Sequence, residues 1–566
     1  MEEIPLQTPW NIYPRPEMRR DSFFSLNGEW ELAFSKKREI PEDFPMRILV
    51  PFPPESSLSG VTAIRQQNEL LYYRRTFHLP EGFHKSKTLL HFGAVDQVVT
   101  VVLNGSPLTT HEGGYLPFSV DVTPYLEEEN VLVLAVEDTL NHDYPYGKQR
   151  VKRGGMWYTP VSGVWQSVWM ESYPEGGIYD VRTSGDDKSV TVSVTSDAAH
   201  LTLTYLDGDE EKTVEFSGSV TLTPESRRLW SPDAPSLYPF TVKSETDEAH
   251  SYFALRRLEA VRVGNRTRFA LNGKPIFLHG VLDQGYFKDG IYLPEDPMEY
   301  EKDVLRTKAL GFNMTRKHIK VEPSLFYEAC DRLGLIVCQD AVNNGAYSFF
   351  WHTALPTVGM KRFPNCLHRK SERAKEIFLS HARDTLDRVS RFPSVLLFTI
   401  FNEGWGQKDE DVAYDTLKAL YPDMLFDTAS GWFQTDKTDM RSDHVYFKRV
   451  KPNYEKEAKP IFLSEFGGYS LPLPGHIFIE GKNYGYTLCK DAAELEARVL
   501  RLYYEEIVPA VRAGLCGAVY TQITDIEDET NGFYTYDREV CKVNTEKFAA
   551  VAKALQAAME ESNGKL

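Results

Sequence analysis

Two glutamates stand where apolar stretches end abruptly, and this pattern suits acid–base chemistry on a sugar. Val395 to Phe401 is apolar apart from one threonine, and Asn402-Glu403 follows directly. A second stretch, Pro-Ile-Phe-Leu-Ser, ends in Glu465, and two glycines follow closely. Facing carboxyl groups cleave glycosidic bonds with retention when they lie about 5–5.5 Å apart, or with inversion at about 6.5–9.5 Å. One such glutamate could equally pair with an arginine or cap a helix, but two at matching positions favour catalysis.

The elements that would hold these carboxyl groups are eight apolar, β-branched stretches that alternate with helical patterns after about residue 263. The predicted strands are Ile276–Asp283, Asn313–His318, Leu335–Val342, Val395–Asn402, Met424–Ala429, His444–Lys448, Pro460–Glu465 and Gly517–Thr524. A (β/α)₈ barrel (TIM barrel) is the predicted fold, with a doubly wound sheet as the alternative. Because barrel chemistry lies at the carboxyl ends of the strands, the fourth and seventh strands would bring both glutamates to one mouth.

Helix signals between these strands support the barrel. Asp296-Pro-Met-Glu299 has the pattern of a helix start, with proline at the first helical position and a capping glutamate. A second helix is predicted from Asp491, bent or ended near Pro509.

The first 262 residues contain short β-type stretches separated by turn residues and almost no helical period. Stretches such as Glu29–Phe34, Val98–Leu103 and Val131–Glu137 predict an antiparallel sandwich. After a linker at Tyr173–Gly177, further short strands predict a second sandwich of about ninety residues, a common immunoglobulin-like size.

Composition and charge exclude several classes of protein. The 566 residues carry 64 Lys and Arg against 81 Asp and Glu, a formal net charge of −17, which disfavours nucleic acid and anionic membranes as partners. We find no secretory signal and no apolar stretch of membrane-spanning length. The six cysteines, Cys366 among them, form no Cys-x-x-Cys pair, so we expect free thiols, no zinc site and a cytoplasmic location.

Strings along nearly the whole chain resemble glycoside hydrolase family 2, the family of β-galactosidases, β-glucuronidases and β-mannosidases. The matching strings in the second half are Asn402-Glu-Gly-Trp405 and Ser464-Glu-Phe-Gly467. Those in the first half are Leu26-Asn-Gly-Glu-Trp30, Tyr73-Arg-Arg-Thr-Phe77, Phe92-Gly-Ala-Val-Asp96, Val102-Leu-Asn-Gly105, Gly113-Gly-Tyr-Leu-Pro-Phe118 and Ser162-Gly-Val-Trp-Gln166. The resemblance implies a jelly roll over residues 1–175, an immunoglobulin-like sandwich over 176–262 and the TIM barrel over 263–566.

The resemblance also implies roles for individual residues. Glu403 would be the general acid/base and Glu465 the nucleophile of a retaining β-glycosidase. Asn402 would bind the sugar 2-hydroxyl, Tyr446 would donate a hydrogen bond to the nucleophile, and Arg316 would lie near the same carboxylate and keep it ionised.

Trp405, which lies in a matching motif, is either packing or a stacking platform for a sugar face. The next positions depart from the family pattern. Asp283 and Gln284 are candidate ligands for sugar hydroxyls, and Tyr520 is a candidate for the floor of the sugar site, where the family has a tryptophan. His318 stands one residue nearer the arginine than the family's histidine, which favours a hydrogen-bonding role over catalysis.

The sugar is the least determined feature. The family's glucuronidases bind the sugar carboxylate with an asparagine and a lysine that stand two residues apart. The corresponding stretch here is Glu529-Thr-Asn-Gly532. Acidic neighbours would repel a sugar carboxylate, namely Asp525, Glu527 and Asp528. A cation from another loop could supply the missing charge, from Lys317, Lys320 or Arg441.

We therefore predict a retaining β-glycosidase that hydrolyses terminal sugars, most simply β-galactosides, without a cofactor or metal and as a homo-oligomer. The alternatives are a β-glucuronidase or another uronide- or mannoside-specific member, a non-catalytic carbohydrate-binding protein, and a scaffold built from the sandwiches.

Overall fold

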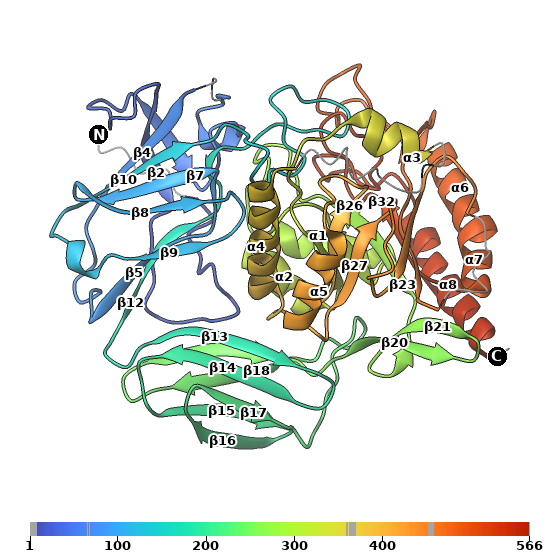
Figure 1. Cartoon of the computed structure of the whole chain (residues 1–566), viewed down its shortest axis with the longest axis horizontal. Coiled ribbons are helices and arrows are strands. Elements are labelled where there is room, and N and C mark those ends of the chain that lie inside the picture. Colours follow the sequence, from blue (N-terminus) through green and yellow to red (C-terminus); the bar gives the residue numbers. More distant parts are fainter. Residues whose placement is uncertain are drawn as a thin grey trace.

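The computed structural model describes residues 8–64, 66, 68–357, 360, 370–450 and 458–564. Three parts follow one another along the chain: a sandwich drawn in blue and cyan, a second in teal and green, and a barrel whose strands and helices run from green to red (Figure 1). Helix α4 (Glu372–Val389) stands on the side of the barrel next to the first sandwich. The predicted multidomain architecture is therefore confirmed, while the exact domain limits stay a prediction.

The first sandwich consists of two antiparallel sheets. The larger has the order β3-β2-β4-β10-β7-β8, with bounds Met46–Val50, Gly28–Ser35, Leu70–Phe77, Asn130–Glu137, Val98–Leu103 and Ser106–Glu112. The smaller has the order β1-β12-β5-β9, with bounds Phe24–Ser25, Val168–Tyr173, Lys87–Phe92 and Phe118–Asp121. A two-stranded pair, β6 (Val95–Asp96) and β11 (Gly163–Val164), lies beside them.

The second sandwich is smaller and follows the period of two that half-buried strands require. In β14 (Val190–Ser196) the three valines are buried, whereas the residues between them are partly or fully exposed. Its sheets are β13-β14-β17 (Ile178–Gly185, Val190–Ser196 and Ser219–Leu222) and β16-β15-β18-β19 (Glu210–Phe216, Leu201–Asp207, Tyr238–Lys243 and Glu248–Phe253). A three-stranded sheet, β20-β21-β22 (Leu258–Val263, Arg266–Leu271 and Lys274–Pro275), leads into the barrel.

The barrel is an eight-stranded parallel sheet, and its first strand pairs with both the second and the last. The strands are β23 (Leu278–Asp283), β24 (Met314–Lys317), β25 (Ile336–Asp340), β26 (Val395–Asn402), β27 (Leu425–Ser430), β28 (Arg441–Val445), β29 (Ile461–Gly467) and β32 (Leu515–Thr521). This pairing closes the sheet except between β27 and β28, and it rules out the doubly wound alternative. Strand β26 is buried along its whole length, which explains its continuous apolar sequence.

Helices cover the barrel. They are α1 (Glu299–Ala309), α2 (Ser324–Leu333), α3 (Leu355–Thr357), α4, α5 (Glu410–Leu420), α6 (Ala492–Leu502), α7 (Val508–Ala513) and α8 (Thr545–Gly564). The predicted start of α6 is confirmed, since the Asp491 carboxylate accepts from the backbone N–H of Glu494. The predicted bend takes the form of a π-helical turn at Tyr503–Ile507, between α6 and α7, and Pro509 lies in the first turn of α7.

Within the described residues, no helix combines the length and apolar character needed to cross a lipid bilayer. Five cysteines are free thiols, and Cys366 lies outside the described residues.

Candidate active site

The two glutamates predicted to be catalytic meet at the carboxyl end of the barrel. Glu403 directly follows β26, and Glu465 lies near the end of β29. A carboxylate oxygen of one lies within 4.8 Å of a carboxylate oxygen of the other. This separation is close to the one that retaining glycosidases use and leaves less room than inverting glycosidases need for a water.

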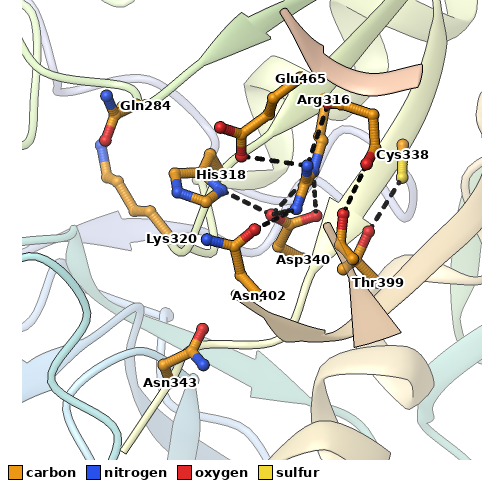
Figure 2. A network of polar contacts seen from close by, with 12 residues as sticks. Gln284, Arg316, His318, Lys320, Cys338, Asp340, Asn343, Thr399, Asn402 and Glu465 are labelled. Atoms are coloured by element: carbon orange, nitrogen blue, oxygen red, sulfur yellow. Dashed lines mark hydrogen bonds and ion pairs between the residues drawn. The ribbon is translucent and has the colours of Figure 1, made fainter. Parts of the chain in front are cut away.

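Arg316 joins Glu465 to its surroundings (Figure 2). Its fully buried guanidinium donates to Glu465 Oε1 at 3.2 Å and to Asn402 Oδ1 at 3.0 Å. It also forms an ion pair with Asp340 at 2.9 Å, and His318 Nδ1 lies 2.7 Å from the same carboxylate. The structure therefore brings together Arg316, Asn402 and Glu465 as predicted, and gives His318 the hydrogen-bonding role expected of it.

The environment of Glu465 favours its ionised form. Burial by itself would raise the pKa of this carboxyl, but the charges of His444 and Arg316 outweigh burial and hold the pKa well below its ordinary value. The Tyr446 hydroxyl donates to Glu465 Oε2, and it also lies 2.9 Å from Thr521 Oγ1. Tyr446 thus lies where the sequence predicted, although it follows β28 and is not part of the strand.

Glu403 has a different environment. Its side chain is 16% exposed, against 7% for Glu465, and its Oε1 lies 2.8 Å from His444 Nδ1. Its backbone is left-handed, with φ of 53°, a conformation that non-glycine residues adopt rarely and that is concentrated at functional sites. The neighbouring carboxylate on β29 needs a sharp turn after it, and Gly467 provides this with φ of 87° where a Cβ would lie 2.2 Å from the Tyr520 ring.

Trp405 serves as packing between two parts of the chain. It is 3% exposed, and its ring centroid lies 5.3 Å from those of both Tyr146 and Trp157, which come from the first sandwich. Its indole N–H donates to the carbonyl of Gly345 at 2.9 Å. Since two protein rings pack against the indole and little of its surface is exposed, the stacking role is not supported.

Two candidate sugar ligands lie on the outer face of the barrel wall. Asp283 forms an ion pair with Lys317 at 2.6 Å, within a cluster that includes Glu322. Tyr520 packs against Phe466 and Tyr503, in the core between the strands and the helices that cover them. The structure does not bring these two side chains to the glutamates, because their strand neighbours Leu282 and Thr521 face the barrel interior instead.

The residues at the position of the family's uronate-binding pair form a network of hydrogen bonds with one another. The Glu529 carboxylate accepts from the Tyr158 hydroxyl and, at 2.9 Å, from the Asn531 amide. Gln522 donates to Asn531 Oδ1 at 2.9 Å and accepts from Gln284 at 2.8 Å, and Gln284 donates to the Tyr158 hydroxyl at 2.9 Å. Asn531 is therefore committed to protein partners, whereas Gln284 is bound only through its amide nitrogen, and its buried Oε1 has no hydrogen-bond partner among the described residues.

The three acidic residues that the sequence placed near a sugar carboxylate already have cationic partners. Asp525 lies 2.6 Å from Lys542 Nζ, and Glu527 and Asp528 both lie 3.3 Å from Arg153. Repulsion of a sugar carboxylate by these groups is correspondingly weaker than their sequence suggests.

Of the three cations proposed to replace the uronate-binding lysine, two already pair with a carboxylate and one lies at the far end of its strand. Lys317 and Lys320 both pair with Glu322, at 2.9 and 3.0 Å, and Arg441 begins β28, at the opposite end of the strand from Tyr446.

Two groups of side chains in the described residues have the spacing of metal ligands. One is Glu403, His444 and Glu465, and the other is His476, Asp537 and Glu539 at the surface. An ion in the first group would occupy both carboxylates needed for glycoside cleavage.

Sequence reasoning missed His444 and Asp340, although a signal for His444 was present. His444 stands two residues before Tyr446, so the alternation of a strand places both on one side. Asp340 ends β25, but the apolar Ala341 and Val342 that follow it placed it inside the predicted strand.

Comparison with known proteins agrees with this architecture. Residues 61–163 match the glycosyl hydrolase 2 galactose-binding domain-like model, and residues 261–529 match the TIM barrel domain of glycosyl hydrolases family 2. A β-glucuronidase from Paenibacillus borealis is 24% identical over 531 residues, which cover 81% of this chain and 85% of the relative. A β-galactosidase from Thermoanaerobacter pseudethanolicus is 26% identical over 294 residues, 48% of this chain but only 39% of that relative.

Among solved structures, the β-D-glucuronidase of Dictyoglomus thermophilum has a TM-score of 0.73 and 18% identity, with 97% of this chain and 98% of that chain covered. This likeness concerns the fold. Because both family domains occur in order in one chain and the barrel mouth holds the paired carboxylates, the chain belongs to glycoside hydrolase family 2.

Proposed function

We propose that the protein is a retaining β-glycosidase with Glu465 as nucleophile and Glu403 as general acid/base. The observation that carries this proposal is the pair of carboxylates within 4.8 Å in unequal surroundings. Glu465 is surrounded by donors that favour the anion, whereas Glu403 is more exposed and has one oxygen bound to His444. This difference is what a nucleophile and a proton donor require.

The reaction has two balanced steps. In the first, a Glu465 oxygen bonds to the anomeric carbon while the glycosidic C–O bond breaks, and the Glu403 proton goes to the leaving oxygen. In the second, a water oxygen attacks the anomeric carbon, its proton passes to Glu403, and the bond to Glu465 breaks. The two inversions return the β configuration.

Asn402 is suited to hold the sugar 2-hydroxyl. Its Oδ1 accepts from Arg316 at 3.0 Å, which fixes the orientation of the amide. In the described part of the chain its Nδ2 has no hydrogen-bond partner, so this N–H can donate to substrate. A bond to the 2-hydroxyl that tightens in the transition state would accelerate both steps.

The test uses isosteric variants. Glu465→Gln abolishes turnover of a nitrophenyl β-glycoside, and Glu403→Gln lowers it by about 10²–10⁴-fold, with partial recovery for a dinitrophenyl leaving group that needs no protonation. Proton NMR of the first product released by the wild-type protein shows the β anomer. Variants as active as the wild type would overturn the assignment and favour a non-catalytic carbohydrate-binding protein.

For the sugar we propose a β-galactoside, as the sequence predicted, because the asparagine and lysine pair of the family's glucuronidases is missing. A β-uronide is the second candidate, and Lys148 is the observation that favours it. Burial raises the pKa of Glu529, and the charge of Lys148 opposes that rise, so this ammonium lies near the barrel mouth. Its Nζ has no hydrogen-bond or ion-pair partner within the described residues. The relative from Paenibacillus borealis is named a β-glucuronidase.

Nitrophenyl β-galactoside, β-glucuronide and β-galacturonide distinguish these candidates through kcat/KM. If the uronide is the substrate, Lys148→Met lowers its kcat/KM by about ten- to a hundredfold, since a hydrogen bond to a charged group is lost. Lys152→Met, at an exposed position of the same segment, is the matched control and leaves kcat/KM unchanged. Galactoside preference with no effect of Lys148→Met supports the neutral sugar.

We also propose a homo-oligomer in the cytoplasm, on the resemblance to the family and on the free thiols. Analytical ultracentrifugation tests the first of these proposals, and fractionation of cells tests the second.

A further inference from the structure

His444 connects the two glutamates from a fully buried position at the end of β28. Its Nδ1 lies 2.8 Å from Glu403 Oε1 and 3.6 Å from Glu465 Oε2. The shorter contact is a hydrogen bond and the longer one is not. The hydrogen-bond partner of His444 Nδ1 is therefore Glu403.

We propose that His444 is a positioning residue for the general acid/base. Its Nδ1–H holds Oε1 of Glu403, so that Oε2 alone exchanges the proton with the leaving oxygen and with water. This inference rests on the proposed function, and it adds a residue whose part in the reaction is exerted through Glu403.

The surroundings of the ring favour a hydrogen on Nδ1. Arg316 lies 3.5 Å from Nε2 and can only donate, which suits a neutral ring with Nε2 as an acceptor. The Ser430 hydroxyl, 3.1 Å from Nε2, donates its single hydrogen to Ser464 Oγ, so it can accept from the Nε2–H of a charged ring. A neutral ring then carries its hydrogen on Nδ1, facing the carboxylates, and a charged ring carries one there too. The hydrogen bond to Glu403 exists in both states.

The free oxygen of Glu403 fits the same arrangement. Within the part of the chain that the structure describes, Oε2 has no hydrogen-bond partner, whereas Oε1 is bound. A carboxyl group tied at one oxygen cannot exchange the two by rotating, so its proton stays on the oxygen that faces substrate. The left-handed backbone of Glu403 fixes the base of the side chain and His444 fixes its tip.

Several charged groups face His444 and would respond to its loss. They are Glu403 after β26, Glu465 on β29, Arg316 on β24 and Asp427 on β27. Burial lowers the pKa of the ring, and the two glutamates raise it by more. Removing His444 takes away the hydrogen-bond donor that holds Glu403 Oε1.

Leaving-group dependence is the decisive measurement. In His444→Leu, kcat/KM for a β-glycoside with a poor leaving group, such as an alkyl alcohol, falls by between about tenfold and a hundredfold. With 2,4-dinitrophenol as the leaving group, which departs without protonation, kcat/KM falls by less than about threefold. This difference between the two leaving groups supports the proposal.

Two polar variants keep the test usable if the leucine variant does not fold. In His444→Asn the amide nitrogen stands near the place of Nδ1, whereas in His444→Gln it reaches toward the place of Nε2. We expect the asparagine variant to retain most of the alkyl glycoside activity and the glutamine variant to lose it. Equal activities of these two variants would overturn the proposal.

His279→Leu is the matched control. His279 is also a buried barrel histidine with two hydrogen bonds, at 3.0 Å to the Gly311 carbonyl and 3.1 Å to the Tyr503 hydroxyl. The His279→Leu variant has lower thermal stability and an unchanged leaving-group dependence. If His444→Leu slows the cleavage of both substrates equally, His444 is only structural. A wild-type protein that cleaves no glycoside would instead overturn the proposed function itself.

Discussion

The hydroxyl of Tyr446 tests how the nucleophile is kept ionised. Tyr446→Phe removes one donor to Glu465 and keeps the ring, which stacks on Tyr486 with centroids 3.8 Å apart and planes inclined by 12°. A hydrogen bond to a charged group contributes about 1.5–3 kcal/mol, which corresponds to a loss of roughly ten- to a hundredfold in kcat/KM. The same energy raises the pKa of Glu465 by about one to two units.

The sign of the pH effect follows from the nucleophile's need to be charged. Because Glu465 reacts as the anion, a raised pKa moves the acidic limb of kcat/KM to higher pH and leaves the basic limb in place. The assay is kcat/KM on a nitrophenyl β-glycoside from pH 2 to 8, a range that includes the acidic limb of both proteins, with circular dichroism to verify folding. Tyr486→Phe is the control, since it removes the same atom from the stacked neighbour. An unmoved acidic limb with activity within twofold of wild type would refute the reasoning.

Three other changes have expected outcomes. Arg316→Met leaves the buried Asp340 without its cation, so the free energy of unfolding measured in urea falls by about 3–5 kcal/mol. Trp405→Ala also costs about 3–5 kcal/mol, whereas Trp405→Phe keeps KM unchanged, because the indole packs on protein. Burial would raise the pKa of Glu171, but the charge of Arg15 outweighs burial and the pKa is about 2. The stability it contributes is present above pH 4.5 and is lost as pH falls toward 2, so Glu171→Gln flattens the dependence of Tm on pH between 3 and 5.

The barrel could be predicted from sequence because parallel strands buried on both faces are continuous apolar stretches. Strand β26 has the predicted bounds, Val395–Asn402. The sixth strand was predicted at His444–Lys448 but lies at Arg441–Val445. Its interior-facing residues, Ser442 and His444, take part in the polar network beneath the glutamates, so the apolar signal is missing where the site needs polar groups.

The face of a strand on which a residue lies was harder to predict than its position along the chain. Tyr520 and Asp283 lie on the correct strands, but a one-residue change moves a side chain to the opposite face. Thr521 faces the site, since its hydroxyl lies 2.9 Å from that of Tyr446, and Leu282 packs in the barrel interior. Resemblance to a family determines the face on which a side chain lies only if the alignment is correct to the residue.

The contribution of the first sandwich to the site required the structure, because its contacts join segments hundreds of residues apart. The backbone N–H of Tyr146 donates to the Asn343 carbonyl at 3.1 Å, and that of Thr159 donates to Glu527 at 2.9 Å. Tyr158, from the same segment, donates to Glu529. Loops built on a rigid scaffold vary more readily than the strands beneath them.

These contacts assign different tasks to the two parts of the chain. The barrel strands fix the reacting carboxylates, which must stay at one separation for any sugar. Residues 146–159 of the first sandwich meet the loop after β32 and carry Lys148, so a change in this segment can alter the sugar accepted without moving Glu403 or Glu465. A Lys148 variant that changes the ratio of uronide to galactoside cleavage while the pH limbs stay fixed would demonstrate this separation. Moved pH limbs would mean that the segment also controls the carboxylates.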